Sequence, residues 1–281
     1  MQTPGHVRQT RRAGPGANPV TTSGGGDDIL VIEHLNKRFG GLQAVDDASL
    51  TVERGTLTAL IGPNGAGKTT LFNLITGFDR PDRGRVVFDG HVITARGAPA
   101  IARLGLVRTF QLARDLARLT VLENMLLAAK DQRGELLRYA ALPFRPWRQQ
   151  EAQRLERAAE LLEAFNLDHL RDEYAGNLSG GQRKLLDLAR VLMLEPTMVL
   201  LDEPMAGVNP TLREQLLARI AELRDRGLSF LLVEHDMEVV MRVSEHVIVM
   251  AEGSVIADGS PDEIRANQQV IDAYLGTKAS S

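Results

Sequence analysis

The chain has 281 residues, of which 43% are hydrophobic and 25% are charged, a composition typical of a folded protein with a sizeable core. It contains no cysteine, which excludes disulfides and thiolate metal sites and favours a reducing compartment. No apolar stretch reaches the roughly 20 residues of a membrane-spanning helix, and no apolar signal follows the first methionine. We therefore expect the chain itself to be soluble.

The first 26 residues are rich in Gly, Pro, Thr and Ser and contain three arginines but no acidic residue. The net charge of the whole chain is −3, so the residues after 26 carry a more negative net charge than −3. This negative charge disfavours binding to nucleic-acid phosphates. A stretch with so few large apolar side chains cannot offset its ordering entropy. We expect a disordered tail over residues 1–27, although the three arginines could also touch anionic lipid headgroups, and a short C-terminal tail over 277–281.

After the tail, short β-type runs separated by glycines predict strands joined by turns. These runs cover residues 29–35, 48–55, 56–62 and 85–93. Immediately after the third run comes a glycine-rich loop, and then residues 68–77 carry apolar side chains at helical spacing before a terminal glycine. The order in this region is strand, loop, helix.

Residues 112–177 become helical and charged, with apolar side chains three and four apart in 120–130 and 149–167. This pattern predicts an inserted helical subdomain. Between the two segments, Pro143, Pro146 and Trp147 predict a break or loop over 134–150.

Nearly continuous apolar runs then alternate with helical segments, at residues 197–203, 228–236 and 246–253. Strands buried on both faces are typical of a parallel sheet covered by helices. The predicted fold class is therefore α/β, with a β-rich N-terminal part and the helical subdomain inserted over about 112–177.

The glycine-rich loop matches the pattern G-x-x-x-x-G-K-[ST] between a predicted strand and a predicted helix, which is the context that this phosphate-binding motif requires. Glycines let the backbone curl round a phosphate, Lys68 supplies a positive charge, and Thr69 offers its hydroxyl to Mg²⁺. The alternative is a chance glycine-rich turn. We expect the loop to bind the phosphates of ATP through Gly62, Pro63, Asn64, Gly65, Ala66, Gly67, Lys68, Thr69 and Thr70.

Two acidic residues, Asp202 and Glu203, follow four apolar residues at the expected carboxyl end of a buried strand, where ligands bind in such sheets. We expect Asp202 to hold Mg²⁺, through water because this ion dehydrates reluctantly. Glu203 is then placed to act as general base on an attacking water. The alternative for Glu203 is a solvated carboxylate at a strand end.

A second candidate anion site is the run Leu-Ser-Gly-Gly-Gln at 178–182, which precedes a helical stretch. Ser179, Gly180 and Gly181 at a helix start would present unpaired N–H groups to a phosphate. Ser179 and Gln182 also match the S-x-x-Q pattern of a capping box. The two roles are compatible.

The phosphate loop, the run at 178–182 and the acidic strand end, in this order, resemble the ATP-binding cassette (ABC) ATPases over about residues 29–276. The resemblance implies a head-to-tail dimer with a second ABC ATPase subunit, identical or different. It also implies that the loop of one subunit caps the γ-phosphate held by the phosphate loop of the other. The residues that it assigns to this cap are Ser179, Gly180, Gly181 and Gln182.

Three further positions match this family. Gln111 takes the place of the glutamine that senses Mg²⁺ and the γ-phosphate, and His235 that of the switch histidine near the γ-phosphate. Phe39 takes the place of the aromatic that stacks on adenine. A structural histidine and a core phenylalanine are the alternatives. Asn209 stands where an aspartate is usual, which leaves the contact of this segment across the dimer open.

Narrower stretches, at 37–50, 108–129, 203–210 and 270–276, resemble the ATPases of branched-chain amino acid importers. This implies ATP-driven uptake with two membrane permeases, indirectly a solute-binding protein, and a peripheral place at the cytoplasmic face of the inner membrane. After 276 the sequence resembles no appended regulatory domain. The alternative is a soluble ABC ATPase that acts on nucleic acid or the ribosome, which the single cassette and the acidic body disfavour. We expect no nucleic-acid partner.

Overall fold

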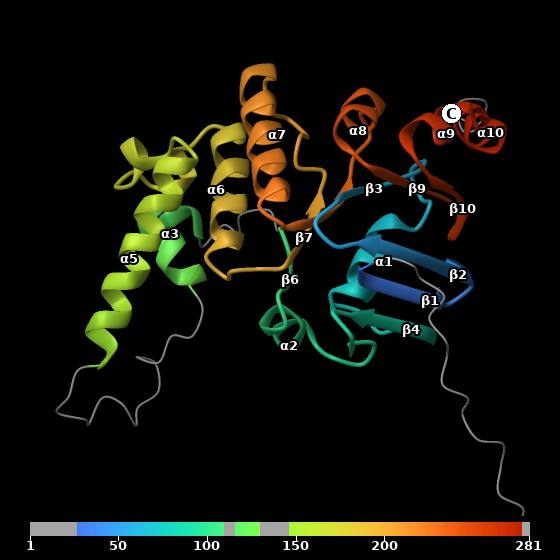
Figure 1. The fold of residues 1–281 in the computed structure, drawn as a ribbon, viewed down its shortest axis with the longest axis horizontal. Helices are drawn as coiled ribbons and strands as arrows, with labels where there is room; N and C mark the ends of the chain where they lie inside the picture. Colours follow the sequence, from blue (N-terminus) through green and yellow to red (C-terminus); the bar gives the residue numbers. More distant parts are fainter. Residues whose placement is uncertain (1–26, 110–115, 130–145, 277–281) are drawn as a thin grey trace, which may run out of the picture.

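The computed structural model describes residues 27–109, 116–129 and 146–276, which form two sheets and the helices around them (Figure 1). Among these residues no helix is both long enough and apolar enough to cross a membrane.

The smaller sheet has the strand order β2-β1-β4-β5 and is antiparallel throughout, as expected for the β-rich N-terminal part. Its strands are β1 (Asp28–Phe39), β2 (Leu42–Glu53), β4 (Arg83–Phe88) and β5 (His91–Val92). The single run predicted at 85–93 is divided because Asp89 and Gly90 both adopt positive φ, which matches the type I′ turn of a two-residue hairpin.

The larger sheet has the order β10-β9-β3-β8-β7-β6, and all of its pairings are parallel except that of β10 with β9. Its strands are β3 (Leu57–Ile61), β6 (Leu106–Arg108), β7 (Met198–Asp202), β8 (Ser229–Val233), β9 (His246–Ala251) and β10 (Ser254–Gly259). The predicted parallel sheet is confirmed, while β6 and β10 were not among the predicted strands.

Alternate side chains of β7 enter two different hydrophobic clusters, which explains why the whole strand is apolar. Met198 and Leu200 pack toward α1 (Lys68–Ile75) and the small sheet, and Val199 and Leu201 pack toward α6 (Gly180–Leu192) and α7 (Pro210–Asp225). A third cluster joins β3 and β9 to the C-terminal helices. The helices beside the large sheet are α1 (Lys68–Ile75), α2 (Ala98–Arg103), α6 (Gly180–Leu192), α7 (Pro210–Asp225), α8 (Met237–Val243), α9 (Pro261–Ala266) and α10 (Gln268–Gly276).

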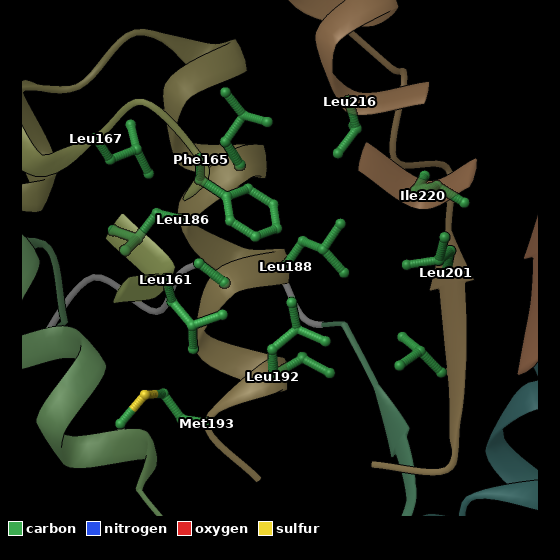
Figure 2. Packing of buried hydrophobic residues seen from close by; sticks show 14 of the residues in the cluster. Leu161, Phe165, Leu167, Leu186, Leu188, Leu192, Met193, Leu201, Leu216 and Ile220 are labelled. Atoms are coloured by element: carbon green, nitrogen blue, oxygen red, sulfur yellow. The ribbon is translucent and has the colours of Figure 1, made fainter. Parts of the chain in front are cut away.

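Within the expected helical subdomain, α3 (Val121–Ala128) and α5 (Pro146–Ala164) lie together and pack on α6. Figure 2 shows Leu161 of α5 and Phe165, which directly follows this helix, facing the same cluster as Leu188 of α6. Short 3-10 turns complete this part, at Leu116–Arg118, Asp168–Leu170 and Ala175–Asn177.

The break predicted over 134–150 is wrong for residues 146–148, because α5 begins at Pro146, while residues 149 and 150 are helical as the pattern over 149–167 predicts. A proline at the first helical position costs little, since the N–H that it lacks would be unpaired there anyway. The rest of the predicted break lies outside the described residues.

Candidate functional site

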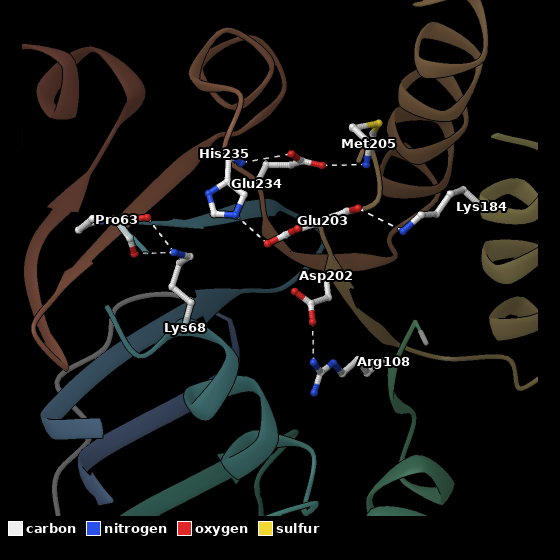
Figure 3. A network of polar contacts seen from close by, with 10 residues as sticks. Pro63, Lys68, Arg108, Lys184, Asp202, Glu203, Met205, Glu234 and His235 are labelled. Carbon is white, nitrogen blue, oxygen red and sulfur yellow. Dashed lines mark hydrogen bonds and ion pairs between the residues drawn. The ribbon is translucent and has the colours of Figure 1, made fainter. Parts of the chain in front are cut away.

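The glycine-rich loop joins β3 to α1, and Lys68 is the first residue of that helix. Its Nζ donates hydrogen bonds to the carbonyls of Gly62 at 2.7 Å and Pro63 at 3.0 Å, so the loop curls over its own lysine (Figure 3). Burial lowers the pKa of Lys68, while the nearby charges of Glu203 and Asp202 act in the opposite direction. The loop therefore holds a desolvated cation against the two carboxylates.

Two glycines explain the shape of the loop. Gly67 precedes α1 with φ +98°, and a Cβ there would overlap the carbonyl oxygen of Ala44. Gly65 has φ +82°, and a Cβ there would meet nothing within 4 Å. The loop thus has one side closed against the protein and an open side where a phosphate can approach the backbone, which fits a nucleotide.

Asp202 is the last residue of β7, and with Glu203 and Thr69 it lines a cavity of about 340 Å³. Arg108, at the end of β6, donates from Nη2 to Asp202 Oδ2 at 2.5 Å and from Nη1 to Asn73 Oδ1 at 2.6 Å. Asn73 belongs to α1, so this arginine joins the helix after the loop to the acidic strand end.

Glu203 and His235 meet although 32 positions separate them: His235 Nε2 lies 2.6 Å from Glu203 Oε1 (Figure 3). Both side chains are 45% exposed. Glu203 has φ +46°, which is uncommon for a residue with a side chain and costs about 1–3 kcal/mol. Hydrogen bonds hold this backbone: the Glu203 N–H donates to Val233 O at 2.9 Å, and Lys184 Nζ donates to Glu203 O at 3.3 Å.

The residues around the cavity fit a bound Mg²⁺ by the chemistry of their donors. Thr69 offers a hydroxyl oxygen and Asp202 a carboxylate, and Mg²⁺ takes such hard oxygen ligands together with substrate phosphates and water. Gln111, the third expected metal contact, lies outside the described residues.

The run at 178–182 forms a capping box. Ser179 Oγ accepts the N–H of Gln182 at 3.3 Å, and Gln182 Oε1 accepts the N–H of Ser179 at 2.9 Å. Gly181 lies against Leu212 of α7, where a Cβ would overlap that side chain. Ser179 and Gly180 are exposed at the helix start. The capping prediction is confirmed, and the hydroxyl proton of Ser179 is still available for donation to a further acceptor.

Phe39, the expected adenine contact, ends β1 with 46% of its surface exposed, so the alternative of a core phenylalanine is wrong. Lys37 Nζ lies 5.0 Å from the centroid of the Phe39 ring.

Asn209 caps α7, because its side chain accepts the N–H of Leu212 at 2.9 Å. Aspartate would cap in the same way, so the substitution leaves the start of this helix intact.

Three polar residues of the site were not among the sequence predictions: Arg108, Lys184 and Glu234. Arg108 contacts the expected metal ligand, Lys184 contacts the backbone of Glu203, and Glu234 accepts backbone N–H groups from both neighbouring loops. The sequence offered a usable signal only for Glu234, which directly follows the apolar run of β8.

Comparison with known proteins identifies the family. A model described as ABC transporter matches residues 45–206, and one described as branched-chain amino acid ATP-binding cassette transporter matches residues 254–280. The chain is 45% identical over 252 residues to the probable branched-chain amino acid transport ATP-binding protein LivG of Archaeoglobus fulgidus, covering 90% of this chain and 97% of that protein. It is 43% identical over 249 residues to the high-affinity branched-chain amino acid transport ATP-binding protein BraF of Pseudomonas aeruginosa, covering 88% and 98%.

Among solved structures, an ATP-binding cassette of an ABC transporter in its ADP conformation superposes with a TM-score of 0.77 at 37% identity. The match covers 89% of this chain and 99% of that one. Sequence and fold therefore agree over nearly the whole length, and this chain belongs to the ABC transporter family as one of its ATP-binding cassette ATPases.

Proposed function

We propose that this chain is the ATP-hydrolysing subunit of an ABC importer that takes up branched-chain or related amino acids. The observation that carries the enzymatic part is the meeting of Thr69, Asp202 and Glu203 around one cavity, with Lys68 and His235 beside them. The names of the relatives support the class of transported solute. The solute itself would never touch this subunit.

The proposed role of each residue combines the geometry of the site with the resemblance to the family. The loop 62–69 and Thr70 would hold the phosphates, Phe39 would stack on the adenine, and Thr69, Gln111 and Asp202 would hold Mg²⁺. The bound metal would supply positive charge to the phosphate oxygens. Because an ionised carboxylate only accepts hydrogen bonds, His235 Nε2–H donates to Glu203 Oε1, which leaves Oε2 of Glu203 to take the proton of an attacking water.

Two such chains, or this chain and a similar one, would enclose ATP head to tail. Ser179 of one subunit would then donate its hydroxyl proton to the γ-phosphate held by the other, while its oxygen still accepts the Gln182 N–H and caps α6. Gly180 and Gly181 would add backbone N–H groups at the same helix start, and Gln182 would add the N–H groups of its side-chain amide.

The remaining partners proposed are two membrane permeases and, through them, a solute-binding protein. These partners would place this chain at the cytoplasmic face of the inner membrane. The ATPase domain would span residues 28–276 between tails at 1–27 and 277–281, and the helical subdomain at about 112–177 would pass the motion of the dimer to the permeases.

The test of the enzymatic roles is Glu203→Gln. The amide keeps the size of the side chain but cannot take a proton, so ATP binding should persist while turnover falls by at least about 100-fold. Glu195→Gln is the matched control, because Glu195 also has a positive φ but does not line the cavity. Near-normal ATP hydrolysis by the Glu203→Gln variant would contradict the assignment of Glu203 as general base.

The test of the transport role is affinity purification of the tagged chain from gently solubilised membranes of its host, followed by mass spectrometry. Two multi-spanning permeases with a second ATPase would support the importer, and uptake of labelled leucine, isoleucine and valine would then identify the solute. Recovery of ribosomal or nucleic-acid partners alone would overturn the import proposal and leave the ATPase site in place.

A further inference from the structure

Glu234 carries a buried carboxyl group between the two loops that present Glu203 and His235. It directly follows β8, precedes His235 in the chain, and is 5% exposed. Burial raises the pKa of this carboxyl group, while the N–H groups of Met205 and His235 lower it. Within residues 27–109, 116–129 and 146–276 it forms no ion pair. A buried carboxyl group destabilises the folded state unless its oxygens accept hydrogen bonds.

Its two oxygens accept hydrogen bonds from the two different loops (Figure 3). Oε1 accepts the N–H of Met205 at 2.8 Å, and Oε2 accepts the N–H of His235 at 3.2 Å. Met205 lies two positions after Glu203, and Pro204 between them has no N–H to contribute. The Glu203 N–H is held by Val233 O, so the side chain of Glu234 continues the link between β7 and β8 beyond the ends of both strands.

This link acts on the pair that the proposed chemistry needs. The backbone of Glu203 is in the left-handed region, which persists only when its surroundings hold it. Without an acceptor for Met205, the loop after Glu203 could relax and the 2.6 Å separation between Glu203 Oε1 and His235 Nε2 would no longer be fixed.

We propose that Glu234 is a positioning residue that sets the separation of Glu203 from His235 by binding the backbone of both of their loops. This inference rests on the proposed roles of Glu203 and His235. A neutral glutamine would retain one acceptor oxygen, and its amide group would face an N–H donor, so it replaces the carboxylate only in part.

The first test measures kcat and KM for ATP of the full-length variants Glu234→Ala and Glu234→Gln. A misplacement near 1 Å reduces rates by up to about 100-fold, so we expect kcat to fall about 10- to 100-fold in the alanine variant and less in the glutamine variant, with KM near the wild-type value. An alanine variant that remains folded in a urea titration and keeps a wild-type kcat would overturn the proposal, as would an equal loss through KM.

The second test does not depend on activity and keeps the proposal falsifiable. Nitrogen-15 labelling of histidine, with His235 assigned from a His235→Gln variant, reports the hydrogen bonding of its Nε2. The Glu234→Ala substitution should change this signal, whereas an unchanged signal would refute the link to His235.

Glu245→Ala is the matched control. The carboxylate of Glu245 also accepts a backbone N–H, from Leu57 at 2.7 Å, but it does not line the 340 Å³ cavity. We expect this variant to lose stability and to keep both kcat and the His235 signal.

The Glu203→Gln variant separates a failure of this inference from a failure of the proposed function. If Glu203→Gln hydrolyses ATP normally, the proposed catalytic role of Glu203 is wrong. If Glu203→Gln is inactive while Glu234→Ala has normal activity, only the positioning role of Glu234 is wrong.

Discussion

Arg108 donates a 2.5 Å hydrogen bond from Nη2 to Oδ2 of Asp202, so the carboxylate proposed as a metal ligand already has a cation beside it. The Arg108 side chain is 10% exposed, and its Nη1 donates to Asn73 Oδ1. Arg108 and a metal ion are therefore expected to compete for the same carboxylate.

Replacing Arg108 by glutamine should lower the Mg²⁺ concentration that gives half-maximal ATP hydrolysis. A hydrogen bond between charged groups contributes about 1.5–3 kcal/mol, and 1.4 kcal/mol corresponds to a factor of ten, so the expected shift is about 10- to 100-fold. The measurement is ATPase activity against Mg²⁺ at saturating ATP. Arg85→Gln, which removes a loose 3.8 Å pair with Glu33 on the small sheet, serves as control. An unchanged or higher Mg²⁺ requirement would argue against competition.

Two glycines of the phosphate loop should respond differently to substitution by alanine. At Gly67 the new Cβ would overlap the backbone of Ala44, whereas at Gly65 it would enter open space. We expect Gly65→Ala to lose about 1–2 kcal/mol of unfolding free energy from its positive φ, and Gly67→Ala to lose more. Urea titrations without nucleotide measure both losses.

Nucleotide affinity completes this comparison, because the Cβ at Gly65 would occupy the side of the loop where a phosphate is expected. Gly65→Ala should therefore weaken ATP binding more than its stability loss explains. Gly227→Ala is the control: Gly227 also has a positive φ with nothing within 4 Å, but it follows α7. Equal ATP affinities for the Gly65 and Gly227 variants would exclude a phosphate at the open side of the loop.

The larger sheet could be predicted because its central strands are continuous apolar runs. The strand β6 has three residues, too few to show a period, and its extended state depends on pairing with β7, a segment about 90 residues away. Likewise, Pro146 reads as a break in the sequence, yet it begins a helix, because the sequence does not show which helical position a proline will take.

The site likewise contains residues that the sequence could predict and residues that it could not. Lys68, Asp202 and Glu203 belong to local motifs and could be predicted from the sequence. Arg108 and Glu234 could not, because their roles depend on partners 94 and 29 positions away, Asp202 and the backbone of Met205. Contacts of this kind carry no local pattern and become visible only when the sheet brings the strand ends together.

Substitutions at Ser179 can separate its capping role from the proposed phosphate contact. Ser179→Ala removes the acceptor for the Gln182 N–H and should cost about 1 kcal/mol of stability. Ser179→Asp keeps a good helix cap but adds a negative charge where the γ-phosphate is expected. The aspartate variant should therefore be as stable as the wild type and nearly inactive in ATP hydrolysis. If it retains full activity in the assembled dimer, Ser179 is a cap and nothing more.

Asp187 of α6 should make stability depend on pH in the acidic range. Burial raises the pKa of its carboxyl group to about 6, against the opposing effect of Arg190, whose Nη1 lies 3.4 Å away. The folded state therefore binds this proton more tightly than the unfolded chain, whose carboxyl has a pKa near 3.8. The contribution to stability is complete below the unfolded value and is lost as the pH rises through about 6.

Each pKa unit corresponds to about 1.4 kcal/mol. When the pH is raised from 4.5 to 7.5, the unfolding free energy of the wild type should therefore fall by about 2 kcal/mol more than that of Asp187→Asn. Urea titrations at both pH values measure this difference. Asp172→Asn, at an exposed aspartate, should behave like the wild type. Parallel pH profiles for the wild type and Asp187→Asn would mean that the carboxyl group is hydrated or paired well enough to ionise normally in the folded protein.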